Sequence, residues 1–257
     1  MFNRYKNQKR SPLKKESLSQ AGQSLNEKMY DVFIDKVLAP LAITLFVFYM
    51  AIVEWIRVFF NVPNSPWPYT IISIIVGIYC LIKVRHSLND IKNLRLGRDG
   101  ERLVGEALEE LRMAGYRVYH DILSESFNID HIIIGPAGVF TIETKTYRKR
   151  GKNPQIYYDG VKIEVNGVSS LKDPVKQAKG QMYWLEGFIN DNAKIKVKVR
   201  PVVVFPGWFI NQRDSNAEVW VLNEKALCVF LKNAEKSLNQ EQINSIANHL
   251  ENYIRNN

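Results

Sequence analysis

Residues 128–145 read NIDHIIIGPAGVFTIETK and decide the fold of the soluble part of this chain. Two apolar, β-branched runs, Ile132–Ile134 and Val139–Ile142, flank the sequence Gly-Pro-Ala-Gly at 135–138. Proline and glycine there supply the dihedral angles of a tight turn. The stretch therefore predicts a β-hairpin.

The predicted hairpin brings charged side chains together. With the turn centred on residues 136–137, Asp130 lies directly opposite Glu143 on the neighbouring strand. Side chains on a strand repeat every two residues, so Lys145 shares the face of Glu143. Two facing carboxylates repel each other by about 1 kcal/mol or more when partly buried, unless a proton or a cation lies between them.

Composition indicates one globular domain with an additional segment. The chain has 257 residues, of which 46% are hydrophobic, and a net charge of +9. Residues 1–96 carry +7 of that charge and residues 97–257 only +2. The two cysteines, Cys80 and Cys228, lack metal-ligand spacing, so a reducing compartment fits and a structural zinc or disulfide does not.

Two apolar runs predict transmembrane helices within residues 37–84. Val37–Ile56 and Trp67–Val84 each approach the ~20 residues that a helix needs to cross a bilayer. A cleaved signal peptide fits badly, because there are two runs and the first starts far into the chain. Two buried core helices are disfavoured, because no polar stripe interrupts Leu41–Val53 or Ile71–Ile82.

Charge around these runs predicts the topology. The loop at residues 61–68 has no Lys or Arg, whereas both flanks are basic. The positive-inside rule then predicts a multi-pass protein of the plasma or inner membrane with both termini cytoplasmic. Residues 1–36 form a basic cytoplasmic tail, flexible over residues 1–30, and residues 85–96 a helical stalk that ends at Gly97. Glu54 and Arg57 are expected to pair near the outer end of the first span.

The soluble part predicts an α/β fold. Asp99 is expected to cap a helix that ends at Gly115. This helix carries Glu101 on its core-facing side, where acidic residues are rare and usually have a specific role. Pro201 indicates an irregularity or an edge strand. The predicted elements around the hairpin are strands at 116–122, 161–165, 197–205 and 218–222, a helix at 174–191, and closing helices at 224–233 and 240–254.

These motifs together resemble a known family. Gly97-x-x-Gly100-Glu101, Ile129-Asp130-His131, Gly138-Val139-Phe140-x-Ile142-Glu143-Thr144-Lys145 and Pro174-x-x-Gln177 are similar to the nuclease-related domain (NERD) of the PD-(D/E)-x-K nuclease superfamily. The resemblance covers roughly residues 97–222, with residues 223–257 as helices packed on the domain. Ile129 stands where the superfamily label has proline, as is common within the NERD group.

The resemblance implies a fold and a site. The fold would be a restriction-endonuclease-like core of helix, three-strand meander, helix and strand. Asp130, Glu143 and Lys145 would be catalytic, supported by Glu101 and Gln177. The three carboxylates would hold Mg²⁺ or Mn²⁺, a hard ion whose bound water attacks the phosphate. Lys145 would deprotonate that water or stabilise negative charge on the phosphate.

Other interpretations of single residues stay open. A Glu-x-Lys pair on a strand is often a solvated ion pair. His120 and His131 are expected to be packed or hydrogen-bonded rather than ligands. The basic segment 145–152 fits phosphate contacts or solvated lysines, and Trp184 and Tyr147 fit base stacking or core packing.

The sequence thus favours a membrane-anchored, cytoplasmic-facing, metal-dependent nuclease acting on DNA. The alternative is a non-catalytic nucleic-acid-binding or signalling module tethered to the membrane. A two-span transport or sensing protein fits less well, because the spans hold no central ionisable residue.

Overall fold

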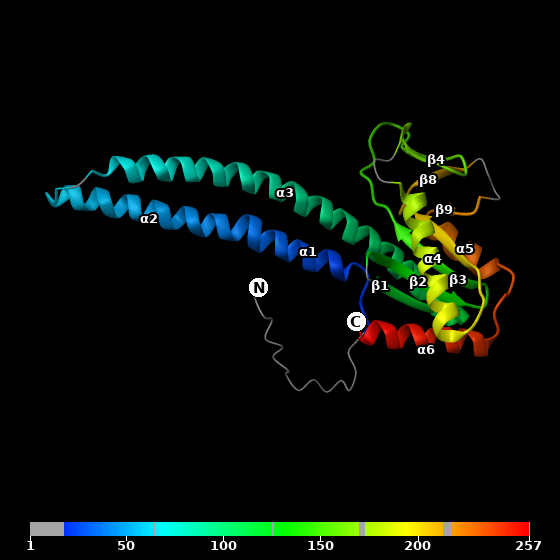
Figure 1. Cartoon of the computed structure of the whole chain (residues 1–257). Coiled ribbons are helices and arrows are strands. Elements are labelled where there is room, and N and C mark those ends of the chain that lie inside the picture. Colours follow the sequence, from blue (N-terminus) through cyan, green and yellow to red (C-terminus); the bar gives the residue numbers. More distant parts are fainter. Residues whose placement is uncertain (1–17, 64, 125, 170–172, 213–216, 257) are drawn as a thin grey trace. The chain divides into compact units, whose positions relative to one another are not determined.

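The computed structural model describes residues 18–63, 65–124, 126–169, 173–212 and 217–256 (Figure 1). The chain divides into two compact units. One comprises residues 22–99, and the other comprises residues 100–257 together with residues up to 21.

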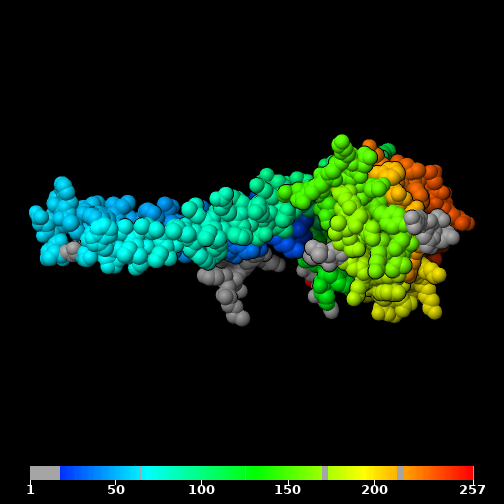
Figure 2. All heavy atoms as spheres, turned by 90° about the horizontal axis from the view of Figure 1, so that it is seen from above, coloured from blue at the N-terminus to red at the C-terminus, as the bar shows by residue number. Residues whose placement is uncertain are grey.

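The unit of residues 22–99 is a helical hairpin. Helix α1 (Gln23–Phe33), a short π-helical segment (Ile34–Leu38) and α2 (Ala39–Phe59) form one arm. The other arm is α3, which starts at Trp67 and ends at Glu109 in the second unit. Figures 1 and 2 show α2 and α3 side by side. The arms run antiparallel, because Trp55 donates to Thr70 (3.0 Å) and Arg98 donates to Asn26 (3.1 Å).

Apolar side chains cover the outside of this hairpin. Phe59 is 81% exposed, Leu45 69% and Leu81 67%. Both helices are long and apolar enough to cross a membrane, and α2, with 21 residues, is about 32 Å long. A core helix would have buried these side chains, so the core-helix alternative does not fit. The predicted pair of Glu54 and Arg57 is confirmed at 3.2 Å.

Two expectations about the N-terminal part were wrong. Part of the predicted flexible tail is helical, because α1 begins at Gln23; residues 1–17, with most of the basic cluster, lie outside the described residues. Gly97 and Asp99 neither end nor start a helix, since α3 runs through both. A glycine inside a helix costs only about 1 kcal/mol. A Cβ on Gly97 would lie 3.2 Å from the Leu25 side chain, so the glycine makes room for α1.

The second unit is built on a five-stranded mixed sheet. Strands β1 (Arg117–Leu123), β2 (Asn128–Gly135) and β3 (Gly138–Thr144) form an antiparallel meander. Helix α4 (Pro174–Ala193) then leads to β7 (Val199–Val204), which lies parallel to β3 on one side and to β9 (Trp220–Leu222) on the other. The predicted α/β core of helix, meander, helix and strand is confirmed.

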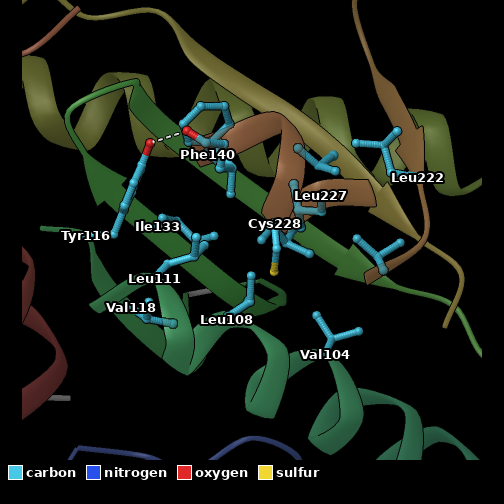
Figure 3. Close-up of a cluster of buried hydrophobic side chains, with 14 residues drawn as sticks. Val104, Leu108, Leu111, Tyr116, Val118, Ile133, Phe140, Leu222, Leu227 and Cys228 are labelled. Atoms are coloured by element: carbon cyan, nitrogen blue, oxygen red, sulfur yellow. Dashed lines mark hydrogen bonds between the residues drawn. The ribbon is translucent and has the colours of Figure 1, made fainter. Parts of the chain in front are cut away.

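Helices cover both faces of this sheet. One face packs against the end of α3 and against α5 (Glu224–Asn233), as Figure 3 shows. Tyr116 donates to the backbone oxygen of Leu231 at 2.6 Å across that core (Figure 3). The other face packs against α4 and α6 (Gln240–Asn256). The site strands are therefore buried on both sides, which holds their side chains in fixed positions.

A second, smaller sheet was largely missed from the sequence. Its order is β6 (Val168–Ser169), β5 (Ile163–Val165), β4 (Gln155–Tyr158) and β8 (Phe209–Gln212). Only the strand at 161–165 was predicted. The other strands are two to four residues long, which is too short for a periodic pattern, and β4 pairs with a strand about fifty residues away.

Pro201 is not on an edge strand. Strand β7 lies inside the sheet, between β3 and β9. Strand β9 pairs only with residues 202–204, so Pro201 precedes the part of β7 that is paired on both sides. The proline is tolerated at this position because β9 does not pair with it.

Candidate active site

Strands β2 and β3 carry the two central carboxylates. The observed register pairs His131 with Ile142, as the hairpin predicted, and continues to Asp130 beside Glu143. Both acids are buried, at 8% and 2% exposure. The backbone N–H of Thr144 donates to Asp130 Oδ2 at 2.7 Å, which fixes the Asp130 side chain against the neighbouring strand.

Lys145 follows β3 and reaches back to Glu143. Its backbone N–H donates to Val204 O at 2.9 Å, so the sheet pairing holds the residue just past the end of β3. Its Nζ donates to Glu143 Oε1 at 2.5 Å and to Gln177 Oε1 at 3.0 Å. The predicted shared face of Glu143 and Lys145 is thus observed, and Gln177 lies beside them.

Helix α4 contributes a further residue that the sequence did not place in the site. Gln181 is 1% exposed, and its Nε2 donates to Glu143 Oε2 at 2.5 Å and to Asn128 O at 3.3 Å. Gln177 and Gln181 are four residues apart and therefore project from the same side of α4. This spacing could have identified Gln181 from the sequence, because a glutamine four residues after Gln177 projects from the same side of the helix and meets the same neighbours.

Helix α3 brings Glu101 to the same region. Glu101 is 8% exposed and its charge acts on Asp130. The preceding Gly100 has a steric role: a Cβ at this position would lie 1.9 Å from Thr146 Oγ1. The Gly-Glu pair of the sequence motif thus allows close approach of the segment after Lys145 and places a carboxylate beside it.

The electrostatics of the site centre on Asp130. Its pKa is raised well above the ordinary value, first by burial and then by the charges of Glu143 and Glu101. The Thr144 N–H and the Lys145 ammonium oppose this shift. A proton or a cation at this position therefore relieves repulsion among three carboxylates.

The donor set fits a hard divalent cation with few protein ligands. No group of three or more His, Cys, Asp or Glu side chains among the described residues is spaced to hold a metal ion. The metal set of Asp130, Glu143 and Glu101 stays a prediction. Mg²⁺ is commonly held by one or two carboxylates and keeps several waters. Two buried carboxylates on adjacent strands meet that requirement.

His120 and His131 lie on the face of the main sheet opposite to Asp130 and are hydrogen-bonded to each other. His120 Nδ1 and His131 Nδ1 are 2.8 Å apart, and Glu109 Oε1 lies 3.0 Å from His120 Nε2. Burial first and His120 second lower the pKa of His131 well below its ordinary value. The packed, hydrogen-bonded state predicted for both histidines is confirmed.

The aromatic residues predicted for stacking or packing are packed. Trp184 lies against the core of α4 and α6, with Phe188, Tyr253 and Phe127 around it. Tyr147 stacks on Phe205, with ring centres 6.0 Å apart.

Part of the chain is similar to known proteins. Residues 96–206 match the model of the nuclease-related domain, NERD. The chain is also 39% identical over 56 residues to an uncharacterized protein of Bacillus anthracis, a stretch that covers 20% of this chain and 26% of that protein. The alignment thus spans about a quarter of the length of this relative. No solved structure matches.

Proposed function

We propose that the nuclease-related domain matched by residues 96–206 is an active, metal-dependent nuclease that hydrolyses phosphodiester bonds in DNA, anchored to a membrane by the helical hairpin. One observation carries the proposal. The carboxylates of Asp130 and Glu143 are buried side by side on adjacent strands, and the Lys145 ammonium lies 2.5 Å from Glu143. Burying charged groups costs free energy, and a hydrolytic site accounts for that cost because its chemistry uses these groups.

Asp130 and Glu143 would hold Mg²⁺ or Mn²⁺, and Glu101 would hold one of its waters. When bound, the ion supplies positive charge for the phosphate and lowers the pKa of a bound water. The raised pKa of Asp130 supports this assignment, because a cation beside the carboxylate would offset the burial and the repulsion that raise the pKa.

Lys145 would act on the water or on the phosphate. Its ammonium can stabilise the charge that develops on the phosphate oxygens, and its neutral form can take the proton of the attacking water. Gln177 would orient the Lys145 side chain through the 3.0 Å contact, and Gln181 would fix Glu143 through its second oxygen. Both glutamines are thus proposed as positioning residues.

The hairpin would place this chemistry at the cytoplasmic face of a membrane. Its exposed apolar side chains and the absence of Lys and Arg from the connecting loop support two spans with both ends on one side. The nuclease domain follows the second helix and would therefore work on that side.

The full-length chain in detergent tests the proposal. We expect labelled DNA to be cleaved with Mg²⁺ or Mn²⁺ and to stay intact with EDTA, and we expect Lys145→Ala to lose cleavage by about 100-fold or more. Lys225→Ala, an exposed lysine on α5, is the control and should cleave like the wild type. Equal cleavage by Lys145→Ala and the wild type would overturn the assignment.

A second candidate is a module that binds nucleic acid without cleaving it. Both carboxylate oxygens of Glu143 already accept hydrogen bonds, from Lys145 and from Gln181, and a site satisfied by its own side chains favours this candidate. Calorimetric titration with Mn²⁺ separates the two candidates. Binding that disappears in Asp130→Asn supports the nuclease, and no binding to the wild type supports the module.

A further inference from the structure

A basic segment connects the candidate site to the small sheet. Residues 146–152, here called the basic strap, follow directly on Lys145. The strap has no acidic residue and carries four exposed cationic side chains: Arg148, Lys149, Arg150 and Lys152.

The positive charge of the soluble part is concentrated in this region. Residues 146–169, which comprise the strap and strands β4 to β6, carry five Lys or Arg and two Asp or Glu. The other residues between 97 and 257 carry 17 Lys or Arg and 18 Asp or Glu. The net charge of +2 for residues 97–257 thus arises from +3 here and −1 elsewhere.

The strap is fixed in position by stacking and hydrogen bonds, and its four cationic side chains stay exposed. Tyr147 stacks on Phe205 at its start. The Nζ of Lys149 donates to Gly207 O at 2.5 Å and lies 5.9 Å from the centre of the Trp208 ring. Asn166 then donates to Arg150 O at 3.4 Å. An ordered strap loses little conformational entropy when it binds a ligand.

A groove lies between the strap and strands β4 and β5 of the small sheet. Its volume is about 460 Å³, and Arg150, Lys152 and Asn166 line it. Glu164 is the acidic lining residue. A Cβ on Gly151 or Gly167 would meet no atom within 4 Å, so the backbone of both turns is open to a ligand. Cations, amides and open backbone are the groups that bind phosphate oxygens.

We infer that the basic strap and this groove bind the phosphate backbone of the nucleic acid whose scissile phosphate lies at Lys145. This inference rests on the proposed nuclease function. Arg150 is five residues beyond Lys145, a reach of at most about 18 Å. Phosphates follow each other every ~3.4 Å along the axis of a duplex strand, so the strap reaches at most about five nucleotides beyond the cut. Contacts to phosphates carry no base readout, and binding is therefore independent of sequence.

The test is equilibrium binding of the full-length chain in nanodiscs of neutral phosphatidylcholine to a fluorescent 20-base-pair duplex in EDTA. The double variant Arg150→Gln/Lys152→Gln should bind about 10-fold more weakly at 150 mM salt, and the slope of log affinity against log salt should fall by about 2. Lys225→Gln/Lys236→Gln removes the same charge from exposed positions outside the strap and should bind like the wild type.

Other outcomes have defined meanings. Equal affinity and salt slope in the double variant and the wild type would overturn the inference. The inference would also be overturned if the double variant lost affinity for phosphatidylserine vesicles but not for the duplex, because the strap would then bind anionic lipid. Failure of the nuclease proposal is a separate result: wild-type binding would keep its dependence on Arg150 and Lys152, but no divalent ion would produce cleavage.

Discussion

The two sheets of the unit that contains residues 100–257 use charge in opposite ways. In the main sheet, Asp130 and Glu143 are buried and are satisfied by named partners, Thr144, Lys145 and Gln181. Beside the small sheet, the cations of the basic strap are exposed, and few acidic residues lie near them in the sequence. Buried charges that depend on a few partners suit chemistry, because losing one partner leaves another unsatisfied. Exposed charges suit binding, because each contributes a small, additive amount.

Glu143→Gln is expected to have the largest effect, because it removes one of the buried charges of the main sheet. The substitution keeps the shape but removes the charge that Lys145 contacts at 2.5 Å and that is proposed to hold the metal ion. We expect DNA cleavage to fall by about 100-fold or more. Binding of the duplex in EDTA should change little, because the strap is intact. A loss of binding as large as the loss of cleavage would contradict the separation of the two sheets.

Gly100→Ala tests whether the close approach behind the site is required. The new methyl group would lie 1.9 Å from Thr146 Oγ1, so the Thr146 side chain, helix α3 or the start of the strap must move. We expect a loss of about 1–3 kcal/mol in unfolding free energy and weaker cleavage, measured by thermal unfolding and by the DNA assay.

Gly180→Ala is the matched control for that substitution. Gly180 lies inside α4, and a Cβ there would meet no atom within 4 Å. The alanine should stabilise the protein by up to about 1 kcal/mol, because it favours the helix. If both alanines had the same effect, the steric explanation for Gly100 would fail.

Gln181→Leu and Gln177→Leu compare a buried with a half-buried neighbour of the site. Gln181→Leu leaves Glu143 Oε2 buried without its donor, a loss of about 1–3 kcal/mol in stability. Gln177→Leu should have a smaller effect on stability, because water can reach Lys145 in its place. Thermal unfolding of the two variants measures the difference, and a ranking in the opposite order would contradict the hydrogen-bond assignment.

Asp130→Asn probes the pH dependence that the site creates. The pKa of Asp130 is raised in the folded state, so the folded state binds the proton more tightly than the unfolded state does. Stability from this group is complete below the unfolded pKa of about 3.9 and is lost as pH rises through the folded pKa. In EDTA, Asp130→Asn should therefore unfold at a modestly higher temperature than the wild type at pH 7 and at the same temperature near pH 3. A lower unfolding temperature at pH 7 would contradict the raised pKa.

Particular residues show where sequence reasoning succeeded and where it could not. The register that pairs Asp130 with Glu143 followed from the turn at 135–138, because a tight turn fixes both strands. Helix α5 was predicted at its observed bounds, since its apolar spacing is regular. The continuity of α3 through Gly97 and Asp99 was not predictable, because packing against α1 overrides the local preferences of both residues.

By itself, the sequence determined the hairpin, the charges that it carries and the two apolar runs, because turn geometry and hydrophobic periodicity act over a few residues. Only the tertiary structure decided that Gln181 completes the site, that Gly100 makes room for Thr146 and that β4 pairs with β8. These contacts join residues that are far apart in the chain. Their energies exist only when the sheet and its helices have packed, so no local pattern records them.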